Sequence, residues 1–156
     1  MSSEVKDLFG PSTAFSITLA SLAASSGGAG RQSAVVDNQS TRFGRLFVYA
    51  RIKQGTSPTS GRSVQLYLLR GDGAGNRDDG GGAADAAITV QNAQLIGVLN
   101  NKSSGAASGD VLQGWFAVDN PGREFAVAVV NDTGAALDAS GSNHDVRYYG
   151  VNPEVQ

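Results

Sequence analysis

The single histidine of the chain, His144, is the residue from which ordinary acid–base catalysis could be built. A serine or threonine nucleophile needs a base beside it and a third group that orients the base. Asp145 follows His144 directly, but neighbouring residues of a strand point to opposite faces of a sheet, so the two make a poor dyad. The chain also lacks a Gly-x-Ser-x-Gly motif. We therefore predict a surface or interface histidine and no enzyme, with an enzyme built on His144 as the third hypothesis.

The segment 70–85, RGDGAGNRDDGGGAAD, is the one stretch that offers several oxygen ligands for calcium. Its candidate ligands are Asp72, Asn76, Asp78 and Asp79. An EF-hand register that starts at Asp72 fails, because Ala74 and Arg77 stand where a ligand and the turn glycine are needed. Ala83 also replaces the closing glutamate. We interpret the segment as a solvated hairpin tip and predict neither a metal nor a cofactor, although ion binding by this loop stays open.

Three Asn-x-Ser/Thr sequences begin at Asn38, Asn101 and Asn131. The N-terminal sequence MSSEVKDLFG carries acidic residues and lacks an apolar centre, so we expect no signal peptide. Without an export signal, the three asparagines indicate turn composition more than glycan attachment.

Aromatic side chains are the remaining material for a binding surface. Strand alternation would place at least half of them in the core, so core packing is the favoured interpretation and a platform of two or three rings is the alternative. Such a platform would bind sugars or a protein partner. The candidate interaction surface comprises Phe47, Tyr49, Arg51, Tyr67, Trp115 and Tyr149.

The composition indicates one soluble domain rich in turns. The chain has 156 residues, of which 40% are hydrophobic, 17% are charged and 21 are glycine. A net charge of −2 makes nucleic acid an improbable direct partner, and no apolar run is long enough for a membrane span. The absence of cysteine excludes disulfides and thiolate metal sites.

Alternation of apolar and polar residues, with no helical periodicity, predicts an all-β sandwich of jelly-roll type with about eight or nine strands. We expect a flexible N-terminal arm at 1–11, a single domain at 12–151 and a C-terminal tail at 152–156. The predicted strands cover 15–22, 31–38, 44–53, 63–70, 87–90, 94–99, 111–118, 124–131 and 145–151.

The tripeptide Val-Asp-Asn occurs at 36–38 and again at 118–120, and each copy is followed five residues later by a phenylalanine, Phe43 or Phe125. The favoured interpretation is a recurrent turn in which Asp and Asn side chains bond to the backbone. A duplicated half-sandwich is the alternative.

Three parts of the chain, in the same order, resemble a family of small virion proteins of tailed phages. The first is STAFSITLASL (12–22) leading to VDN (36–38). The second is ADAAITV (84–90) with LIGV (95–98), and the third is VVNDTGAALD (129–138) followed by SNH (142–144) and YYGV (148–151).

The resemblance implies a structural virion protein with a β-sandwich fold. It implies a capsid decoration (cement) protein, made in the host cytoplasm, that binds the outer surface of the major capsid protein shell and stabilises it. The expected partners are the major capsid protein and other virion proteins, and the expected state is a homo-oligomer, taken as a trimer. The alternative is a tail, baseplate or fibre-associated sandwich that binds host-surface glycans.

Overall fold

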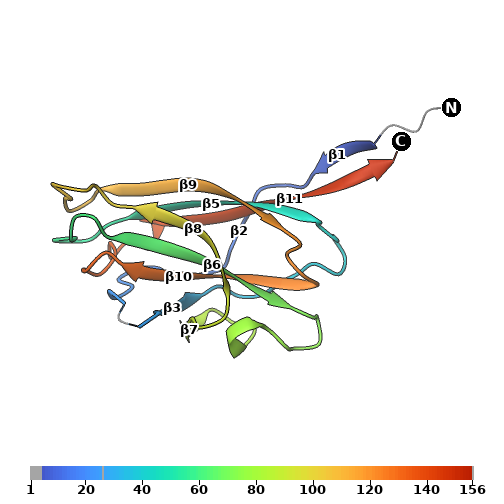
Figure 1. The fold of residues 1–156 in the computed structure, drawn as a ribbon, viewed down its shortest axis with the longest axis horizontal. Helices are drawn as coiled ribbons and strands as arrows, with labels where there is room; N and C mark the ends of the chain where they lie inside the picture. The colour runs from blue at the N-terminus through green and yellow to red at the C-terminus, as the bar shows by residue number, and fades with distance from the viewer. Residues whose placement is uncertain (1–4, 26, 156) are drawn as a thin grey trace.

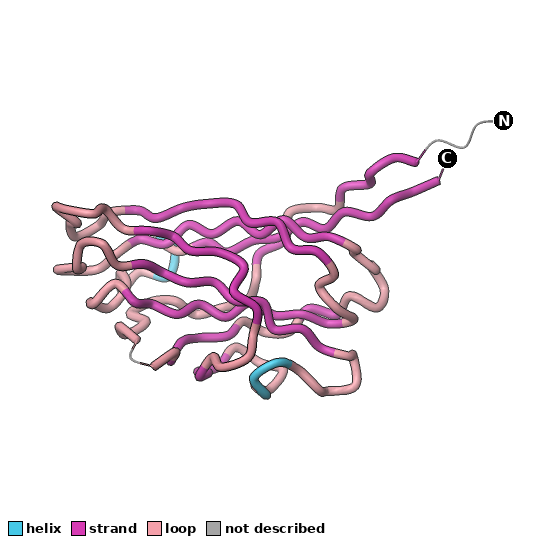
Figure 2. The backbone as a smooth tube through the Cα atoms, in the orientation of Figure 1, coloured by secondary structure: helices cyan, strands magenta, loops and turns pink. Residues whose placement is uncertain are grey.

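The structure of the chain is a computed structural model that describes residues 5–25 and 27–155. These residues form eleven strands and two single turns of 3-10 helix, η1 (Asp78–Gly80) and η2 (Gly141–Asn143). The strands make two antiparallel sheets that face each other (Figures 1 and 2). The all-β sandwich predicted from the sequence is therefore confirmed. No helix in the described ranges is long and apolar enough to cross a membrane.

Each sheet has one long central pairing and a short strand at its side. Sheet A consists, in spatial order, of β1 (Val5–Phe9), β11 (Asp145–Val155), β5 (Arg45–Lys53) and β9 (Val111–Asp119), with β2 (Thr13–Ala14) also on β11. Sheet B consists of β7 (Ala86–Thr89), β3 (Ala29–Gln32), β10 (Glu124–Asp132), β6 (Ser63–Gly71) and β8 (Gln94–Asn100), with β4 (Val36–Asp37) also on β10.

The strand order is that of a jelly roll. The strands can be numbered as eight successive positions along the chain. Position 1 is β1 with β2, and position 2 is β3 with β4. Positions 3 to 8 are β5, β6, β8, β9, β10 and β11, and β7 is an additional strand. Sheet A then contains positions 1, 8, 3 and 6, and sheet B contains positions 2, 7, 4 and 5. This interleaving of early and late strands is the double Greek key of the jelly roll. The eleven strands exceed the expected eight or nine because the predicted strand 31–38 is divided into β3 and β4, and because β1 and β2 lie outside the predicted strands, whereas the predicted strand 15–22 is not formed.

Alternation builds the core between the sheets. In β5, Leu46, Val48, Ala50 and Ile52 are fully buried, as the sequence pattern predicts. Three rings from separate parts of the chain meet at its centre: Phe125 lies edge-on to Phe15 and to Tyr148, with centroids 6.1 and 5.2 Å away. Such pairs contribute about 0.5–1.5 kcal/mol each beyond the burial of their area.

Strand β10 is buried on both of its faces, along seven consecutive residues. Its inner residues, such as Phe125 and Val127, enter the main core. Its outer residues Ala126 and Ala128 pack with Leu69 and Ile88 in a second, smaller cluster. A central strand covered on both sides needs a continuous apolar run, and FAVAVV (125–130) supplies one.

Two predicted strands are wrong in detail. The segment 15–22 forms no strand: Phe15 and Leu19 are buried as alternation predicts, but the segment makes only single backbone bonds, such as Phe15 N–H to the Val146 carbonyl at 2.9 Å. The segment 31–38 is divided at Ser33, whose hydroxyl accepts the Val127 amide at 3.1 Å. A side chain thus replaces a ladder bond and separates β3 from β4.

The ends of the chain form a two-stranded ribbon. Strand β1 pairs with β11 from Phe9↔Val151 to Val5↔Val155, whereas β5 stops at Arg45, opposite Val151. Residues 152–155 therefore pair only with β1, and the ribbon projects beyond the sandwich (Figures 1 and 2). We expected an arm at 1–11 and a tail at 152–156, but residues 5–9 and 152–155 are paired strand. Residues 1–4 and 156 lie outside the described residues.

Gly150 allows the base of the ribbon to close. A Cβ on Gly150 would overlap the ring of Phe43. The ring lies over the glycine because Asn152 binds the same loop, donating from Nδ2 to the Thr41 carbonyl at 2.7 Å. The ribbon and the loop 38–44 are thus packed together at one end of the molecule.

We predict that Gly150→Ala destabilises the fold by about 1–3 kcal/mol, the usual cost of overpacking a closed contact. Urea unfolding followed by Trp115 fluorescence measures the change. Gly141→Ala is the matched control, because a Cβ there has nothing within 4 Å, and it should change stability by less than about 0.5 kcal/mol. Equal losses in the two variants would contradict the role of the Phe43 contact.

Candidate interaction surfaces

His144 has no catalytic partner among the described residues. Its Nε2 lies 2.9 Å from the backbone carbonyl of Asp138, and its Nδ1 is buried without a hydrogen bond. The carboxylate of Asp145 instead accepts the Nε–H of Arg147 at 2.8 Å. As expected for neighbours in a strand, His144 and Asp145 do not form a dyad. Within residues 5–25 and 27–155, no group of three His, Cys, Asp or Glu side chains is placed to hold a metal ion.

Asp138 organises the loop that precedes β11. Its carboxylate accepts Nδ2 of Asn143 at 2.8 Å and the amide of Ser140 at 2.9 Å, and it lies 3.2 Å from Nζ of Lys53. These donors, led by Asn143, lower the pKa of Asp138 from 3.8 to about 2. The carboxylate therefore fixes the loop to β5 and acts as a structural group.

The carboxylates of the loop 70–85 accept hydrogen bonds from within the loop and from the neighbouring turn 91–93. Asp72 accepts the amide of Ala74 at 2.7 Å and Nδ2 of Asn76 at 2.6 Å. Asp79 accepts the backbone amides of 91–93 at 2.8 to 3.0 Å. Burial alone would raise the pKa of Asp79, but these three amides lower it. The carboxylates of Asp72 and Asp79 are thus engaged by hydrogen-bond donors of the chain itself. The segment as a whole is not the hairpin tip that the sequence suggested, because it joins β6 to β7, which lie apart in sheet B and do not pair with each other.

Aromatic rings of sheet A gather on its outer face, the side away from sheet B. The Phe47 and Tyr149 rings are stacked with centroids 5.1 Å apart, and Trp115 lies 4.9 Å from Tyr49 and 5.7 Å from Tyr149. Phe9 from the ribbon completes the group, 6.1 Å from Tyr149. We call these five residues the aromatic face. It is larger than the two or three rings expected, because outward aromatic residues of the neighbouring strands β11, β5 and β9 lie side by side and Phe9 of β1 joins them.

The aromatic face is partly open to solvent. Trp115 is 57% exposed and Phe9 is 62% exposed, although each belongs to a large apolar side-chain type. Ion pairs flank the rings at both ends: Arg45 with Asp119 at 2.6 Å, and Arg147 with Asp145 at 2.8 Å. An apolar centre with a charged rim is the usual anatomy of a protein-binding surface.

Two members of the predicted surface are placed differently. Arg51 lies on the same face of β5 as Phe47 and Tyr49, one step beyond the rings. Tyr67 lies on sheet B, where its hydroxyl donates to Gln65 at 2.7 Å and its ring packs beside the smaller cluster. Sequence alternation gives the direction of a side chain in its own strand but does not say which sheet contains the strand. Phe9 was missed because its strand was assigned to an arm.

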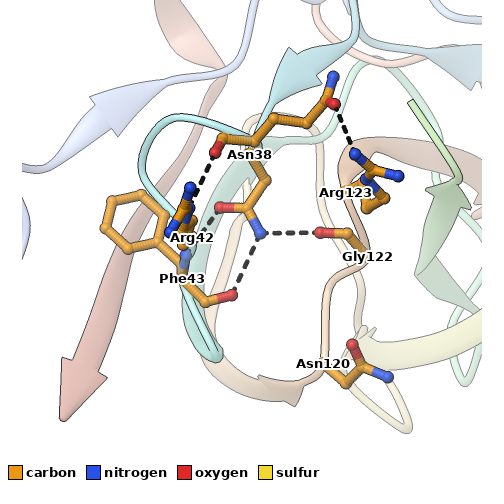
Figure 3. A pocket seen from close by; sticks show the side chains of 7 residues that line it. Asn38, Arg42, Phe43, Asn120, Gly122 and Arg123 are labelled. Carbon is orange, nitrogen blue, oxygen red and sulfur yellow. Dashed lines mark hydrogen bonds between the residues drawn. The ribbon is translucent and has the colours of Figure 1, made fainter. Parts of the chain in front are cut away.

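A depression of about 350 Å³ lies at the end of the sandwich near the ribbon, and we call it the arginine pocket (Figure 3). Its lining residues are Asn38, Gln39, Arg42, Phe43, Asn120, Gly122 and Arg123. The buried side chain of Asn38 joins its two loops by donating to the carbonyls of Phe43 at 3.1 Å and Gly122 at 2.8 Å. Its Oδ1 accepts the Phe43 amide at 2.8 Å and the Thr41 hydroxyl at 2.9 Å.

The two Val-Asp-Asn tripeptides meet at the arginine pocket, but they differ in role. In the first, Asp37 accepts the amide of Gln39 at 2.8 Å and Asn38 makes the bonds given above, so the predicted capping turn is confirmed. In the second, Asn120 has a positive φ of 50° and its amide donates to the Gly44 carbonyl at 2.9 Å. The tripeptides thus converge in space at one end of the fold; duplication of a half-sandwich stays a prediction.

Most basic side chains of the described chain have a carboxylate within 4.0 Å, but four of the nine arginines do not. Three of these four are at this end. Arg42 and Arg123 line the pocket, and Arg70 donates to the backbone carbonyls of Asn120 at 2.6 Å and Asp119 at 3.1 Å. The fourth is Arg51. The pocket therefore carries positive charge in a chain of net charge −2.

Comparison with known proteins does not assign the chain to a family. No protein-family profile and no curated protein match it. Two solved structures of infectious bursal disease virus are similar at 15% identity: one of the Gx strain, with a TM-score of 0.23, and one of a VP2 subviral particle, with a TM-score of 0.22. Each match covers 97% of this chain and 43% or 42% of the other, so the chain spans less than half of their length. TM-scores this low do not establish a shared fold.

We predict that Asp138→Asn removes part of the acid sensitivity of the fold. A carboxylate whose folded pKa is lowered stabilises the fold above its unfolded pKa, and this contribution is lost as the pH falls through the folded pKa. For Asp138 the loss occurs between about pH 4 and pH 2. Urea unfolding at pH 6 and pH 2 should show a smaller difference for Asp138→Asn than for the natural chain. A difference of equal size would contradict the prediction.

Proposed function

We propose that the protein is a structural component of a tailed-phage virion, most specifically a capsid decoration protein that binds the outer surface of the major capsid protein shell. The partners are then the major capsid protein and further copies of the chain, in a trimer. In this role the protein stabilises a particle and catalyses no reaction. The choice of a phage capsid protein as the partner rests on the family resemblance carried by residues 12–22, 84–98 and 129–151.

The observation that carries a binding role is the projecting ribbon. An isolated pair of strands is marginally stable in water, and both of its edges offer unpaired backbone groups. The ribbon also exposes Leu8 at 56% and Phe9 at 62%. A partner that covered these side chains would stabilise the ribbon and gain apolar burial at the same time.

The aromatic face supports the same role, since Phe9 belongs to both features. A partner that binds the ribbon can extend along Tyr149 to Trp115 without leaving the apolar surface. Trp and Tyr rings at the centre of a contact supply much of the binding free energy in protein interfaces. A rigid sandwich that presents one such surface is suited to a repeated contact on a shell.

A second candidate function is favoured by the aromatic face alone. The exposed ring of Trp115, with the half-buried ring of Tyr49 beside it, is suited to stack on sugar rings, so a tail, baseplate or fibre-associated module for host glycans is the alternative. The two functions differ in partner, and separate experiments distinguish them.

For the leading proposal we expect the chain in purified virions, with cryo-EM density at capsomer junctions. Leu8→Ser with Phe9→Ser should lower recovery on particles about tenfold or more, because burial of each side chain contributes roughly 1.5–3 kcal/mol. Leu95→Ser with Val98→Ser is the matched control, since both residues are exposed apolar positions of β8. Density confined to the tail would contradict capsid decoration.

For the alternative, binding of the purified chain to a glycan array should be lost in Trp115→Ala and retained in Tyr67→Ala. The two substitutions remove rings from opposite sheets, which separates stacking on the aromatic face from a general loss of stability. An array with no bound glycan for the natural chain would remove this candidate.

A further inference from the structure

The arginine pocket has the features of a built anion site. It is lined by two guanidinium groups and by no carboxylate. The three acidic residues that neighbour lining residues in the sequence are engaged elsewhere. Asp37 accepts the amide of Gln39, Asp119 pairs with Arg45, and Glu124 pairs with Arg77. Positive charges that lie close together without a counter-ion repel each other, so an anion placed between them is stabilised.

Gln39 holds both guanidinium groups with neutral oxygens. Its backbone carbonyl accepts Nε–H of Arg42 at 3.3 Å, and its side-chain Oε1 accepts Nη2–H of Arg123 at 3.1 Å (Figure 3). Within the described part of the chain, both Nη groups of Arg42 and the Nε and Nη1 groups of Arg123 donate no hydrogen bond. Several charged donors are thus available on groups whose positions are already set.

The frame of the pocket is rigid. Three side-chain bonds of Asn38 close the loop 38–43, and the fourth, to the Gly122 carbonyl, joins it to the loop 120–123. Arg70 holds the start of the second loop by bonds to the carbonyls of Asp119 and Asn120. Arg42 and Asn120 have positive φ angles of 54° and 50°. Such angles cost energy for residues other than glycine and persist only where surrounding contacts impose them. The donors are therefore organised before any ligand arrives, which lowers the entropic cost of binding.

The surroundings favour a protein as the source of the anion. The ring of Phe43 forms one wall of the pocket, and the same ring packs on Gly10 and Gly150 at the base of the ribbon. Asn152 of the ribbon also accepts the amide of Gly44 at 3.2 Å. A partner on the ribbon would thus reach the pocket directly. A nucleic acid needs an extended basic surface, whereas most other basic side chains of the described chain are ion-paired.

We propose that the arginine pocket binds a side-chain carboxylate from an acidic segment of the protein partner that contacts the ribbon. The choice of partner rests on the proposed function. Arg42 and Arg123 contact the carboxylate through charge-assisted hydrogen bonds, for which the guanidinium fork is suited. Asn38 and Arg70 are positioning residues.

The test uses the full chain and a hexaglutamate peptide as the probe, in an NMR titration at low ionic strength. The expected result is a set of amide shifts confined to 38–44 and 120–123. The variant Arg42→Asn with Arg123→Gln should bind the peptide about tenfold more weakly, since it loses both charged donors. Asparagine is chosen at position 42 because it tolerates a positive φ. The amide spectrum of the variant shows directly that it is folded.

Arg62→Gln with Lys102→Gln is the charge-matched control, because it removes two positive charges, as the pocket variant does, and neither residue lines the pocket. Arg62 directly precedes the nine-residue strand β6, at the opposite end of the strand from Arg70. Arg62 pairs with Asp132 at 3.3 Å. The control should leave the affinity unchanged. Equal weakening in the control, or equal shifts with hexaglutamine, would overturn the proposal because it would show general charge attraction. Shifts with phosphate or glucuronate but not with the peptide would overturn the assignment to a protein carboxylate.

The titration is independent of the virion. If the peptide does not bind while the ribbon variant still lowers recovery on particles, the pocket assignment is wrong and the proposed function stands. If the peptide binds as expected but the chain is absent from virions, the carboxylate site is confirmed and the virion role is wrong.

Discussion

The burial of β10 on both faces is the constraint on which the rest of the structure depends. A strand with seven consecutive buried residues must be covered by sheet A on one side and by the smaller cluster on the other. It must also pair along both edges, which it does with β6 on one side and with β3 and β4 on the other. Because buried backbone groups need partners, β10 fixes the positions of β3, β4 and β6 beside it, and β7 and β8 then pair with β3 and β6.

The two ends of β10 organise the two ends of the molecule. At its start, Glu124 forms an ion pair with Arg77 at 2.8 Å, and Arg123 enters the arginine pocket. At its finish, the buried Asn131 donates to the carbonyls of Leu22 at 2.9 Å and Ala135 at 2.8 Å. The central strand thus determines where the surface loops lie, and the loops inherit their rigidity from the core.

The sequence predicted the architecture well because alternation follows directly from the geometry of a sheet. The strands β5, β6, β9 and β10 were found almost to the residue, since one face of each strand is apolar. The division between β3 and β4 was not predictable, because it depends on the Ser33 hydroxyl, which accepts the Val127 amide in place of a backbone carbonyl. The ribbon was missed for a similar reason: VKDLF has little alternation, and its pairing with the other end of the chain is a tertiary contact.

Buried asparagines show a second limit of the sequence pattern. The sequence predicts Asn38, Asn101 and Asn131 as turn residues; the first two lie in loops, but Asn131 lies in β10. Each of the three is almost fully buried and joins two segments of the chain. A polar amide in a turn is expected at the surface, and only the folded chain shows which carbonyls surround it. Hydrogen bonds of Asn131 also account for the sequence NDTG (131–134), because Asn131 Oδ1 accepts the hydroxyl of Thr133 at 2.7 Å.

The candidate surfaces follow from how the chain uses its acidic residues. Acidic side chains outnumber basic ones, fourteen to twelve, yet several carboxylates accept backbone amides, as Asp37, Asp72 and Asp79 do. A carboxylate that accepts backbone amides stabilises a turn. Its position is set by these hydrogen bonds and not by an ion pair with a cation. Arginines brought to the same end by the jelly-roll topology then lack partners, as Arg42 and Arg123 do. A chain with net negative charge can therefore present a positive pocket, because local turn chemistry, and not overall charge, decides which side chains are neutralised.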